Sequence, residues 1–589
     1  MFMNTQECDI LRTLYAEPFV NQRILSETSG HSLGVVNRSL RTLMESGYLD
    51  EHAHLTAKAR EEIKQNAPRS AVILAAGFGM RMVPINAMTP KGLLEVNGEP
   101  LVERLIKQLH EAGIDDITLV VGFMKERYEY LIDEYGVELV VNPEYAGKNN
   151  LSSVALVADR ISNTYIVPCD IWSDRNPFNA QEMYSWYMVS DIVDNDSDVR
   201  VNRKMELVNV AGSSGGNAMI GISYLLERDA GPLRERIKAL NESGKHDDDF
   251  WEIALYSQGK MVIPARVVHS SDVVEINTYE QLRELDKDSD QLKSDALDVI
   301  SKVMSCSTDD IVDITVLKKG MTNRSFLFTV KGEKYIMRIP GEGTDQLINR
   351  REEAEVFRTI SGLGLCDDPI YIDPENGYKI TKFLEGVRAC DTESLSDLKA
   401  CMQKLRSFHD MKLKVGHEFD IFGQIEFYED LWGGTPSAYR DYKKTKENVF
   451  SLRPYIEKTR TDRCLTHIDA VPDNFLFYST PEGEKLQLTD WEYSGMQDPH
   501  VDIAMFAIYS YYSKKQIDRL ISIYFGGDCG SRVRAKIYCY IAACGLLWSN
   551  WAEYKSTLGV EFGEYGLKQY RYAKDYYRYA LKEMEVIDE

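Results

Sequence analysis

The sequence predicts a multidomain chain of mixed α/β and α+β class. Its 589 residues are long enough for about three or four domains. Short helical patterns come first, then buried strands alternating with helices, and finally alternating strand patterns followed by long helices. These changes of pattern predict domains over residues 1–66, 70–292 and 298–589.

Composition excludes several classes of protein. The chain is 44% hydrophobic and 27% charged, which is typical of globular proteins. No apolar run approaches the ~20 residues that span a bilayer, and the start lacks a signal peptide, so we expect a cytoplasmic protein without membrane insertion. The ten cysteines form no C-x-x-C pair, so structural zinc is not expected. A net charge of -23 disfavours general polyanion binding.

Residues 1–66 resemble a winged helix-turn-helix domain. "ECDILRTLYAE", "NQRILSETSG" and "SLGVVNRSLRTLMESGYL" have helical spacing, and "LDEHAHLTAKAREEI" predicts a hairpin followed by a helix. Arg38 and Arg41 lie on the candidate recognition helix, but the segment is close to neutral in charge. DNA binding and a protein-interaction or regulatory role both stay open. No catalytic motif precedes Ser70, so we expect the segment to be dispensable for catalysis.

Residues 70–292 predict an α/β domain with a mostly parallel sheet. "SAVILAAG", "DITLVVGF" and "TYIVPCD" are buried-strand runs separated by helical patterns. "LAAGFGMRM" follows the first run, and its glycines would let the backbone approach a triphosphate closely. Met82 breaks the dinucleotide pattern G-x-G-x-x-G. The predicted nucleotide-binding residues are Leu74, Ala76, Gly77 and Gly79, with Arg81 and Lys91 neutralising phosphate charge in catalysis.

The longer string "LAAGFGMRMVPINAMTPKGLLEVNGEPLVERLI" resembles the sugar-nucleotide and phosphocholine nucleotidyltransferases, which implies a Rossmann-like fold. In that family an Asp at a strand end and a second residue near the domain's end hold Mg²⁺. The resemblance implies Asp170 in "IVPCDIW" and Asn277 in "VVEINTYEQL". The alternatives are that Asp170 caps a helix and that Asn277 caps the helix beginning at Thr278.

The implied reaction is attack of a substrate phosphate on the α-phosphorus of an NTP, with pyrophosphate as the leaving group. The nucleophile is already anionic, so catalysis consists of positioning and charge neutralisation. "DDDFWEIAL" resembles a segment of the phosphocholine cytidylyltransferases, which implies that Trp251 and Glu252 meet a quaternary ammonium. A core Trp beside a solvated Glu is the alternative.

The third pattern begins with alternating strands that turn at Lys331–Gly332, and helices dominate after about Leu395. This order suits a bilobal kinase-like fold. Phosphoryl transfer to an alcohol needs an Asp near the hydroxyl, and an Asn and a second Asp to hold Mg²⁺. "LTHIDAVPDNFLFY" supplies Asp469 and Asn474 in the spacing H-x-D-x-x-x-x-N, and "LTDWEYSG" supplies Asp490.

The remaining kinase parts follow in order. "KKGMTNRSF" is the candidate nucleotide-covering loop with Asn323, and "YIMRIPG" places Arg338 where protein kinases have a strand lysine. An exposed strand arginine is the alternative for Arg338. "NRREEAEVF" offers Glu353 as its ion-pair partner, or Glu352 if the register differs by one. "ITKFLEG" predicts the hinge between the lobes.

These motifs resemble the choline/ethanolamine kinases. The resemblance implies that Asp502 in "QDPHVDIAMF" braces the catalytic loop, and that Glu492, Trp548 and Trp551 bind choline. Trp548 and Trp551 lie three apart on one helical face, and aromatic faces attract quaternary ammonium groups. Packing within a helix bundle is the alternative. Some family members carry a Glu in the helix after this Asp, where this chain reads "AIYSYYS".

Together the resemblances imply a bifunctional enzyme. The kinase would make phosphocholine from choline and ATP, and the cytidylyltransferase would convert it with CTP to CDP-choline for surface decoration, with Mg²⁺ at both sites. One alternative uses ethanolamine or another amino alcohol. Others are an antibiotic or sugar kinase fused to a sugar nucleotidyltransferase, and a metabolite-sensing transcription regulator with enzyme-derived domains.

Overall fold

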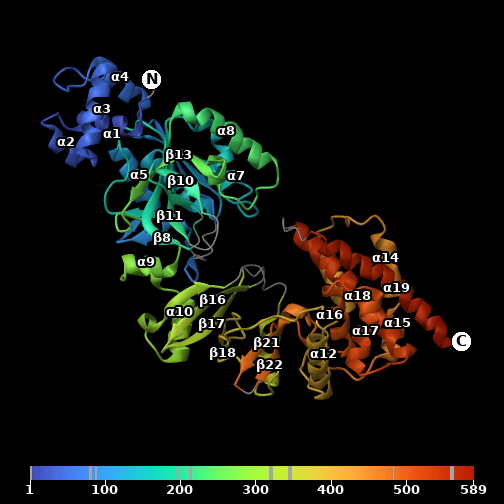
Figure 1. The fold of residues 1–589 in the computed structure, drawn as a ribbon. Helices are drawn as coiled ribbons and strands as arrows, with labels where there is room; N and C mark the ends of the chain where they lie inside the picture. Colours follow the sequence, from blue (N-terminus) through green and yellow to red (C-terminus); the bar gives the residue numbers. More distant parts are fainter. Residues whose placement is uncertain are drawn as a thin grey trace. The chain divides into compact units, whose positions relative to one another are not determined.

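The computed structural model describes residues 3–77, 82–85, 89–195, 197, 199–210, 215–317, 323–341, 348–481, 483–557 and 563–588. The chain forms two compact units, Met1–Ser294 and Asp295–Glu589 (Figure 1). The boundary between the units falls in the polar segment that joins the second and third sequence patterns. The two units are described separately.

The first unit begins with a small helical domain that has the predicted order of elements. Helices α1 to α3 are followed by an antiparallel bridge between Leu49 and Leu55, which forms the wing, and then by α4. Asn4 and Glu7 form a capping box at the start of α1, and Thr56 caps α4. The helices are α1 (Thr5–Ala16), α2 (Gln22–Ser29), α3 (Leu33–Glu45) and α4 (Ala57–Asn66).

The helical domain shares its core with the rest of the first unit. Met183, from the segment before the long strand β8, is 2% exposed and packs among the apolar side chains of α1, α3 and α4. The neighbouring Tyr184 hydroxyl donates to Asp9 Oδ1 at 3.1 Å, and the Tyr224 hydroxyl donates to the Asn66 carbonyl. This docking could not be predicted, because Met183 lies in a loop pattern without periodicity.

A large sheet forms the centre of the first unit, with strand order β5-β4-β1-β6-β11-β8-β13-β10-β9. Strands β5, β4, β1 and β6 are parallel, as the alternation of strand and helix predicted. Its strands are β1 (Ser70–Ala75), β4 (Asp116–Val121), β5 (Glu138–Val141), β6 (Thr164–Pro168), β8 (Trp186–Asp194), β9 (Val199–Val201), β10 (Glu206–Asn209), β11 (Gly216–Leu225), β12 (Tyr256–Ser257) and β13 (Lys260–Val268).

Helices cover both faces of this sheet (Figure 1). Leu105, Ile106 and Leu109 of α5 pack on the face that carries Ile73 and Leu119, while α7 and α8 pack on the opposite face. Small strand pairs, β2–β3 and β7–β14, flank the sheet. These elements are α5 (Leu101–Glu111), α6 (Tyr130–Tyr135), α7 (Asn150–Leu156), α8 (Glu227–Glu242), α9 (Tyr279–Leu285), β2 (Glu95–Val96), β3 (Glu99–Pro100), β7 (Ile171–Ser173) and β14 (Val273–Glu275).

The second unit opens with an antiparallel sheet of order β15-β16-β17-β19-β18. Lys331 and Gly332 form the two-residue turn between β16 and β17, with φ angles of 53° and 79°. Positive φ at both positions matches the twist of a hairpin, so the predicted turn is confirmed. The elements of this lobe are α10 (Asp295–Met304), β15 (Val312–Val316), β16 (Asn323–Val330), β17 (Glu333–Pro340), α11 (Arg350–Ile360), β18 (Tyr371–Ile372) and β19 (Lys379–Lys382).

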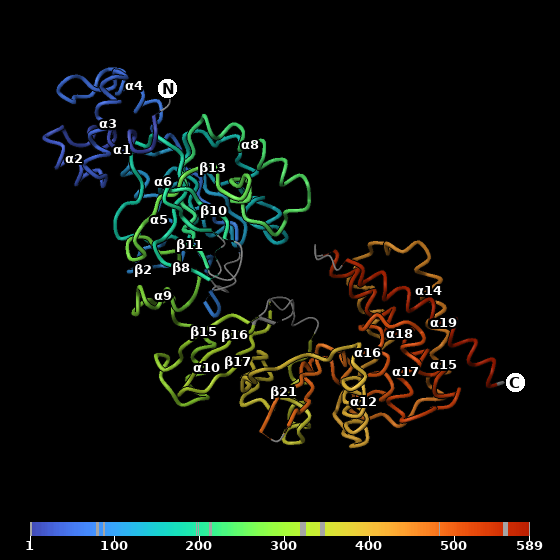
Figure 2. The backbone as a smooth tube through the Cα atoms, viewed as in Figure 1, coloured from blue at the N-terminus to red at the C-terminus, as the bar shows by residue number. Residues whose placement is uncertain are grey.

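A helical lobe follows, in which α18 and α19 run side by side (Figure 2). Short strand pairs β20–β23 and β21–β22 come between α15 and α16 in the chain. The elements are α12 (Leu395–Asp410), α13 (Ile421–Asp430), α14 (Tyr442–Phe450), α15 (Arg453–Thr459), β20 (Cys464–Thr466), β21 (Phe475–Thr480), β22 (Gly483–Leu488), β23 (Gly495–Gln497), α16 (His500–Tyr509), α17 (Lys514–Phe525), α18 (Ser531–Thr557) and α19 (Tyr565–Asp588).

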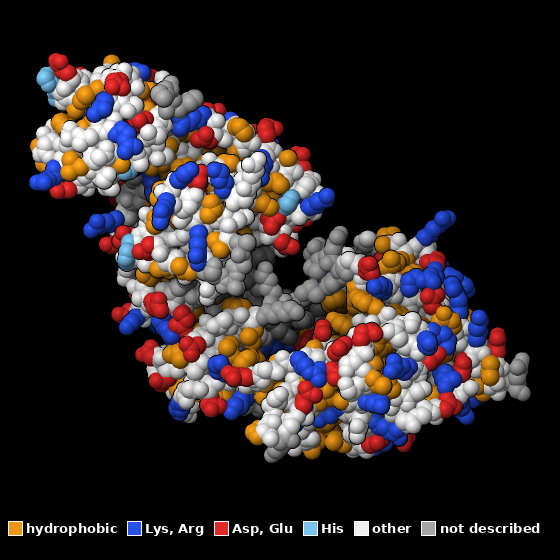
Figure 3. All heavy atoms as spheres, in the orientation of Figure 1, with side chains coloured by type: hydrophobic (Ala, Val, Ile, Leu, Met, Phe, Trp, Pro, Cys, Tyr) orange, Lys and Arg blue, Asp and Glu red, His pale blue; other side chains and the backbone are white. Residues whose placement is uncertain are grey.

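The surface carries both signs of charge. On the face drawn in Figure 3, Lys and Arg side chains are interspersed with Asp and Glu. Within the described part of the chain, no helix has the length and apolarity that crossing a bilayer requires.

Candidate active sites

Three residues predicted from distant motifs meet in the first unit. The Lys91 ammonium contacts Asp170 Oδ2 and donates to Asn277 Oδ1 at 2.8 Å. The Lys91 and Asp170 side chains are 13% and 11% exposed, so a ligand phosphate could reach them while most of the solvent is kept away. The cluster combines one cation with two oxygen donors, a set suited to a magnesium–nucleotide complex.

The fold explains how these residues come together. Asp170 lies between β6 and β7, and β7 pairs antiparallel with β14 so that Ile171 lies opposite Glu275. The Ile276 N–H then donates to the Asp170 carbonyl at 2.9 Å, which brings Asn277 beside Asp170. The strand β7 follows Asp170 directly, so the helix-cap alternative for Asp170 is wrong. Thr278 caps α9, so the same alternative for Asn277 is also wrong.

One oxygen of this cluster has no hydrogen-bond partner. Asp170 Oδ1 is buried and receives no hydrogen bond from the described residues. A buried acceptor left unpaired is costly, and a bound cation would remove that cost. The residues therefore fit Mg²⁺, with Asp170 and Asn277 as the candidate ligands.

The glycine-containing loop after β1 is described only in part. Leu74 and Ala76 are held by backbone hydrogen bonds, since Cys169 N–H donates to the Leu74 carbonyl and Phe123 N–H to the Ala76 carbonyl. Gly77 is exposed beyond the strand end. Gly79 and Arg81 lie outside the described residues. Lys91 itself follows Pro90 and opens a short 3₁₀ helix, Lys91–Leu93.

Trp251 and Glu252 differ from the expectation of an open cation site. Trp251 is 1% exposed and packs in the core against Tyr187, as the alternative held. Glu252 is not solvated: its Oε1 accepts from the Tyr187 hydroxyl at 2.9 Å, and its Oε2 is buried without a partner among the described residues. Burial raises the pKa of Glu252 to about 7. A buried carboxyl with one oxygen that lacks a partner among the described residues is suited to a cationic ligand.

In the second unit, Asp469 and Asn474 are in direct contact. The Asn474 amide donates to Asp469 Oδ2 at 3.0 Å and to the Asp469 carbonyl at 2.8 Å. Burial and the nearby Asp490 carboxylate raise the pKa of Asp469 to about 7, against the lowering effect of the Asn474 hydrogen bond. The hydrogen bonds from Asn474 hold the Asp469 side chain in position within its loop.

Asp502 holds the loop that carries Asp469. Its carboxylate is 0% exposed and accepts from the backbone N–H groups of His467 and Ile468 at 2.9 and 2.8 Å. It also lies 2.9 Å from His409 Nε2. The predicted bracing by Asp502 is therefore confirmed. Ile468 adopts a φ of 66°, which is unfavourable for a β-branched residue and is sustained by these bonds.

Asn474 and Asp490 are joined by the antiparallel pair β21–β22. The Thr489 N–H donates to the Asn474 carbonyl at 2.9 Å, and His467 Nε2 donates to the Thr489 carbonyl at 2.9 Å. Asn474 uses its amide N–H groups on Asp469, so its side-chain oxygen stays available. The Asp490 carboxylate accepts no hydrogen bond from the described residues. These oxygens fit Mg²⁺ at the position that the sequence predicted.

Arg338 forms a buried bidentate pair with Glu353. The two N···O distances are 2.5 and 2.9 Å, and the side chains are 6% and 0% exposed. The predicted pairing of Arg338 with Glu353 is confirmed, and Glu352 does not take part in it. The alternative of an exposed arginine is wrong. Asn323 lies at the start of β16 opposite Pro340, and its side chain is outside the described residues.

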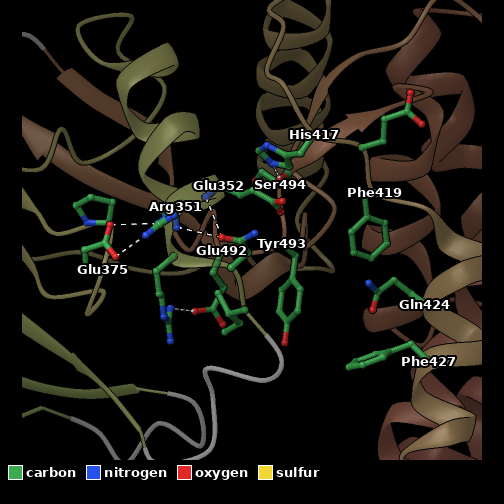
Figure 4. Close-up of a pocket in the computed structure, with 15 residues that line it drawn as sticks. Arg351, Glu352, Glu375, His417, Phe419, Gln424, Phe427, Glu492, Tyr493 and Ser494 are labelled. Atoms are coloured by element: carbon green, nitrogen blue, oxygen red, sulfur yellow. Dashed lines mark hydrogen bonds and ion pairs between the residues drawn. The ribbon is translucent and has the colours of Figure 1, made fainter.

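Glu492 belongs to a buried charge network, and its contact with choline stays a prediction. Its carboxylate is 3% exposed and lies 3.6 Å from the Arg350 guanidinium, which also contacts Glu353. Glu492 and Tyr493 line a cavity of about 530 Å³. Figure 4 shows Phe419 and Phe427 on one side of this cavity and Arg351 with Glu375 on the other.

Aromatic side chains form a cluster within range of the Asp469 charge, which raises the pKa of Tyr493, Tyr509 and Tyr565 secondarily to burial. Trp548 and Trp551 lie 5.7 Å apart between ring centroids, edge to face, as their spacing predicted. The sequence missed the residues that extend this cluster: Tyr493 lies 5.7 Å from Trp548, Tyr565 lies 6.3 Å from Trp551, and Tyr509 lies 6.0 Å from Tyr565. Burial, and secondarily the Asp469 carboxylate, raises the pKa of Tyr509 to about 12. We call Tyr493, Tyr509, Trp548, Trp551 and Tyr565 the aromatic cluster.

Comparison with known families and proteins gives three consecutive matches. Residues 3–50 match the winged helix-turn-helix DNA-binding family, residues 71–174 the MobA-like NTP transferase domain, and residues 314–519 the choline/ethanolamine kinases.

The choline-phosphate cytidylyltransferase of Streptococcus pneumoniae is 30% identical over 37% of this chain and 96% of that protein. The 2-aminoethylphosphonate cytidylyltransferase of Lancefieldella rimae is 33% identical over 37% and 92%. The crystal structure of choline kinase LicA from Streptococcus pneumoniae is 30% identical with a TM-score of 0.42, covering 49% of this chain and all of that one.

Proposed function

We propose that this one polypeptide converts choline to CDP-choline in two steps. The chain belongs to the choline-phosphate cytidylyltransferase family and carries a choline/ethanolamine kinase domain after it. The order of winged helix, nucleotidyltransferase and kinase is the one that the sequence predicted. The product of the second unit would be the substrate of the first. Both reactions would take place in the cytoplasm, where ATP and CTP are available, and CDP-choline would serve a further enzyme that decorates the cell surface.

The observation that carries the proposal is the aromatic cluster beside Asp469. A trimethylammonium group cannot donate hydrogen bonds, so a carboxylate alone discriminates it poorly from a primary amine. Aromatic faces and edges supply attraction and an apolar wall without that requirement. The cluster lies next to the one buried carboxyl that the kinase motif places at the substrate hydroxyl.

In the kinase reaction, Asp469 would orient the choline hydroxyl and accept its proton as the oxygen attacks the γ-phosphorus of ATP. The bond between that phosphorus and the ADP oxygen breaks. Arg338, held by Glu353, would carry positive charge at the nucleotide. Asn474 and Asp490 would hold Mg²⁺, which in these families accompanies the nucleotide and offsets phosphate charge when bound.

In the transfer reaction, a phosphate oxygen of phosphocholine would attack the α-phosphorus of CTP, and pyrophosphate would leave. The nucleophile needs no general base, so the chain's contribution is charge and alignment. Lys91 would neutralise phosphate charge, and Gly77, Gly79 and Arg81 are the further phosphate-binding residues that the sequence predicts. Asp170 and Asn277 would hold Mg²⁺ on CTP, and Glu252 would face the trimethylammonium group.

A primary amine is the second candidate headgroup. The relative from Lancefieldella rimae acts, by its name, on 2-aminoethylphosphonate and is slightly more similar in sequence than the choline-phosphate enzyme. Glu252 could pair with either ammonium type. The aromatic cluster favours choline over ethanolamine in the kinase, because a primary ammonium there would lose its hydrogen bonds.

Turnover with mixed substrates tests the proposal. The purified chain would receive choline, ATP, CTP and Mg²⁺, with products followed by phosphorus NMR. We expect phosphocholine first and CDP-choline with pyrophosphate afterwards. Ethanolamine offered in equal amount should be consumed more slowly. A chain that phosphorylates only ethanolamine, or neither alcohol, would overturn the choline assignment.

The winged helix carries a separate proposal. Arg38 and Arg41 are exposed on α3, where a helix-turn-helix domain meets DNA. Affinity for duplex DNA through this face should fall steeply with salt and be lost in the double variant Arg38→Ala/Arg41→Ala. DNA binding that depends neither on the salt concentration nor on these two arginines would indicate that this face binds a protein partner instead.

A further inference from the structure

A small cavity at the junction of α1 and the large sheet lies outside both candidate active sites. Its volume is about 270 Å³, and arginines from separate segments line it: Arg12 of α1, Arg175 after β7, and Arg266 of β13. The remaining lining is polar or apolar, and Asp272 is its one acidic member. Guanidinium groups rarely converge without an anion, because each adds repulsion to the next.

Behind this cavity the buried Glu182 pairs closely with Arg266 and only distantly with Arg12. Arg266 donates to both oxygens of the buried Glu182 at 2.8 and 2.9 Å and stacks on the Trp186 ring at 3.7 Å. Glu182 also accepts from the Trp186 indole and the Tyr165 hydroxyl. Its oxygens are thus already used, and Arg12 approaches it only to 3.6 Å.

Arg12 and Arg175 keep their hydrogen-bonding capacity. The Arg12 guanidinium is 31% exposed and lies 3.7 Å from Asp9, but it donates no hydrogen bond to the described residues. Asp9 is already shared with His31 at 3.0 Å and the Tyr184 hydroxyl at 3.1 Å. Arg175 is exposed and forms no ion pair with any described residue. The cavity therefore presents the guanidinium groups of Arg12 and Arg175 with a single lining carboxylate, Asp272, to offset their charge.

We propose that this cavity binds a small phosphate-bearing anion, which bridges Arg12 of the winged helix to Arg175 and Arg266 of the catalytic domain. Arginine forks match the oxygens of a phosphate monoester in bidentate fashion, more closely than an ammonium does. The volume lies below the roughly 300–1,000 Å³ of pockets for drug-sized ligands, so a whole nucleotide is too large. Inorganic phosphate and the phosphomonoester of a short alcohol share the required chemistry.

Occupancy would fasten the winged helix to the catalytic domain. Met183 and the Asp9–Tyr184 hydrogen bond already join them at this junction. An anion that neutralises Arg12 and Arg175 would add a second attachment at the other end of the segment that precedes β8. The winged helix would then respond to a phosphate compound without any change at either active site.

Titration calorimetry with inorganic phosphate and, in a second arm, phosphocholine tests the proposal on the full-length chain. We expect Arg12→Ala and Arg175→Ala each to weaken phosphate binding by about tenfold or more. The matched control Arg60→Ala removes an exposed arginine of α4 and should leave binding unchanged. Arg175 is exposed, so its replacement should not disturb folding.

Hydrogen exchange of α1 separates this cavity from the active site. Inorganic phosphate should slow exchange of Thr5–Ala16 in the unmutated chain and in Arg60→Ala, but not in Arg175→Ala. If phosphocholine slows the exchange of α1 at a lower concentration than inorganic phosphate does, the organic ester is the occupant. If both compounds slow it at the same concentration, the cavity recognises the phosphate group alone. Absence of phosphate binding, or binding and protection that are equal in all variants, would overturn the proposal.

Discussion

Lys91 Nζ lies 2.8 Å from Asn277 Oδ1, although 186 positions separate the two residues in the chain. The pairing of β7 with β14 produces this contact, and the same pairing places Asp170 at the lysine. In the second unit, Asp469, Asn474 and Asp490 are joined by a strand pair only a few residues long. One site therefore depends on long-range topology and the other on a local motif.

Replacement of Arg338 by Lys should damage the kinase. Lys keeps the charge but cannot form the bidentate, buried pair with Glu353. We expect the free energy of unfolding of the second unit to fall by about 1–3 kcal/mol and the KM for ATP to rise. The matched control is Arg351→Lys, whose bidentate partner Glu375 is mostly exposed, and it should leave stability nearly unchanged. Equal effects of the two changes in denaturant titrations would contradict this assignment.

The tryptophans should act on choline and not on ATP. Leu keeps an apolar side chain but removes the π face, so Trp548→Leu or Trp551→Leu should raise the choline KM by about 2- to 30-fold. The KM for ATP should stay within about twofold. The neutral isostere 3,3-dimethylbutanol should be a poor substrate and nearly indifferent to both changes. Equal losses for choline and the isostere would show that the tryptophans only pack the helices.

Glu252 should make the stability of the first unit depend on pH. Its folded pKa of about 7 lies above the ordinary value of 4.5, so the folded chain binds more protons and stability falls as pH rises between these values. Glu252→Gln removes this pH-dependent loss of stability. The free energy of unfolding of the variant should exceed that of the unmutated chain by up to about 3 kcal/mol above pH 7 and by little near pH 4.5. It should also raise the KM for phosphocholine.

Thermal unfolding between pH 4.5 and 8 checks this, with Glu235→Gln, exposed on α8, as the matched control. A pH-independent difference between Glu252→Gln and the unmutated chain would contradict the buried-carboxyl account.

Deletion of residues 1–66 should leave choline phosphorylation unchanged, because the kinase lies in a separate compact unit. It should lower the thermal midpoint of the first unit, since Met183 would lose its apolar surroundings. Met183→Ala in the full chain should lower stability by about 2–5 kcal/mol by the same argument. Calorimetry that finds the first unit equally stable without the winged helix would show that the docking is not significant.

The sequence predicted those features that short motifs specify. The H-x-D-x-x-x-x-N spacing gives Asp469 and Asn474 because a tight loop fixes their distance, and Arg338 with Glu353 follows from a strand and helix in fixed order. Trp251, Glu252 and Glu492 were harder to interpret, because burial and partners depend on packing between distant elements. Tyr493, Tyr509 and Tyr565 come from three helices or loops without common periodicity, so no local pattern could join them.

The central claim is that one chain holds two separable reactions, and product analysis of two variants tests it most directly. Asp469→Asn should abolish ATP-dependent phosphorylation of choline but still convert added phosphocholine and CTP to CDP-choline. Lys91→Ala should phosphorylate choline normally and accumulate phosphocholine without CDP-choline. Loss of both activities in a folded Asp469→Asn chain, or CDP-choline formation by Lys91→Ala at the unmutated rate, would contradict the two-site account.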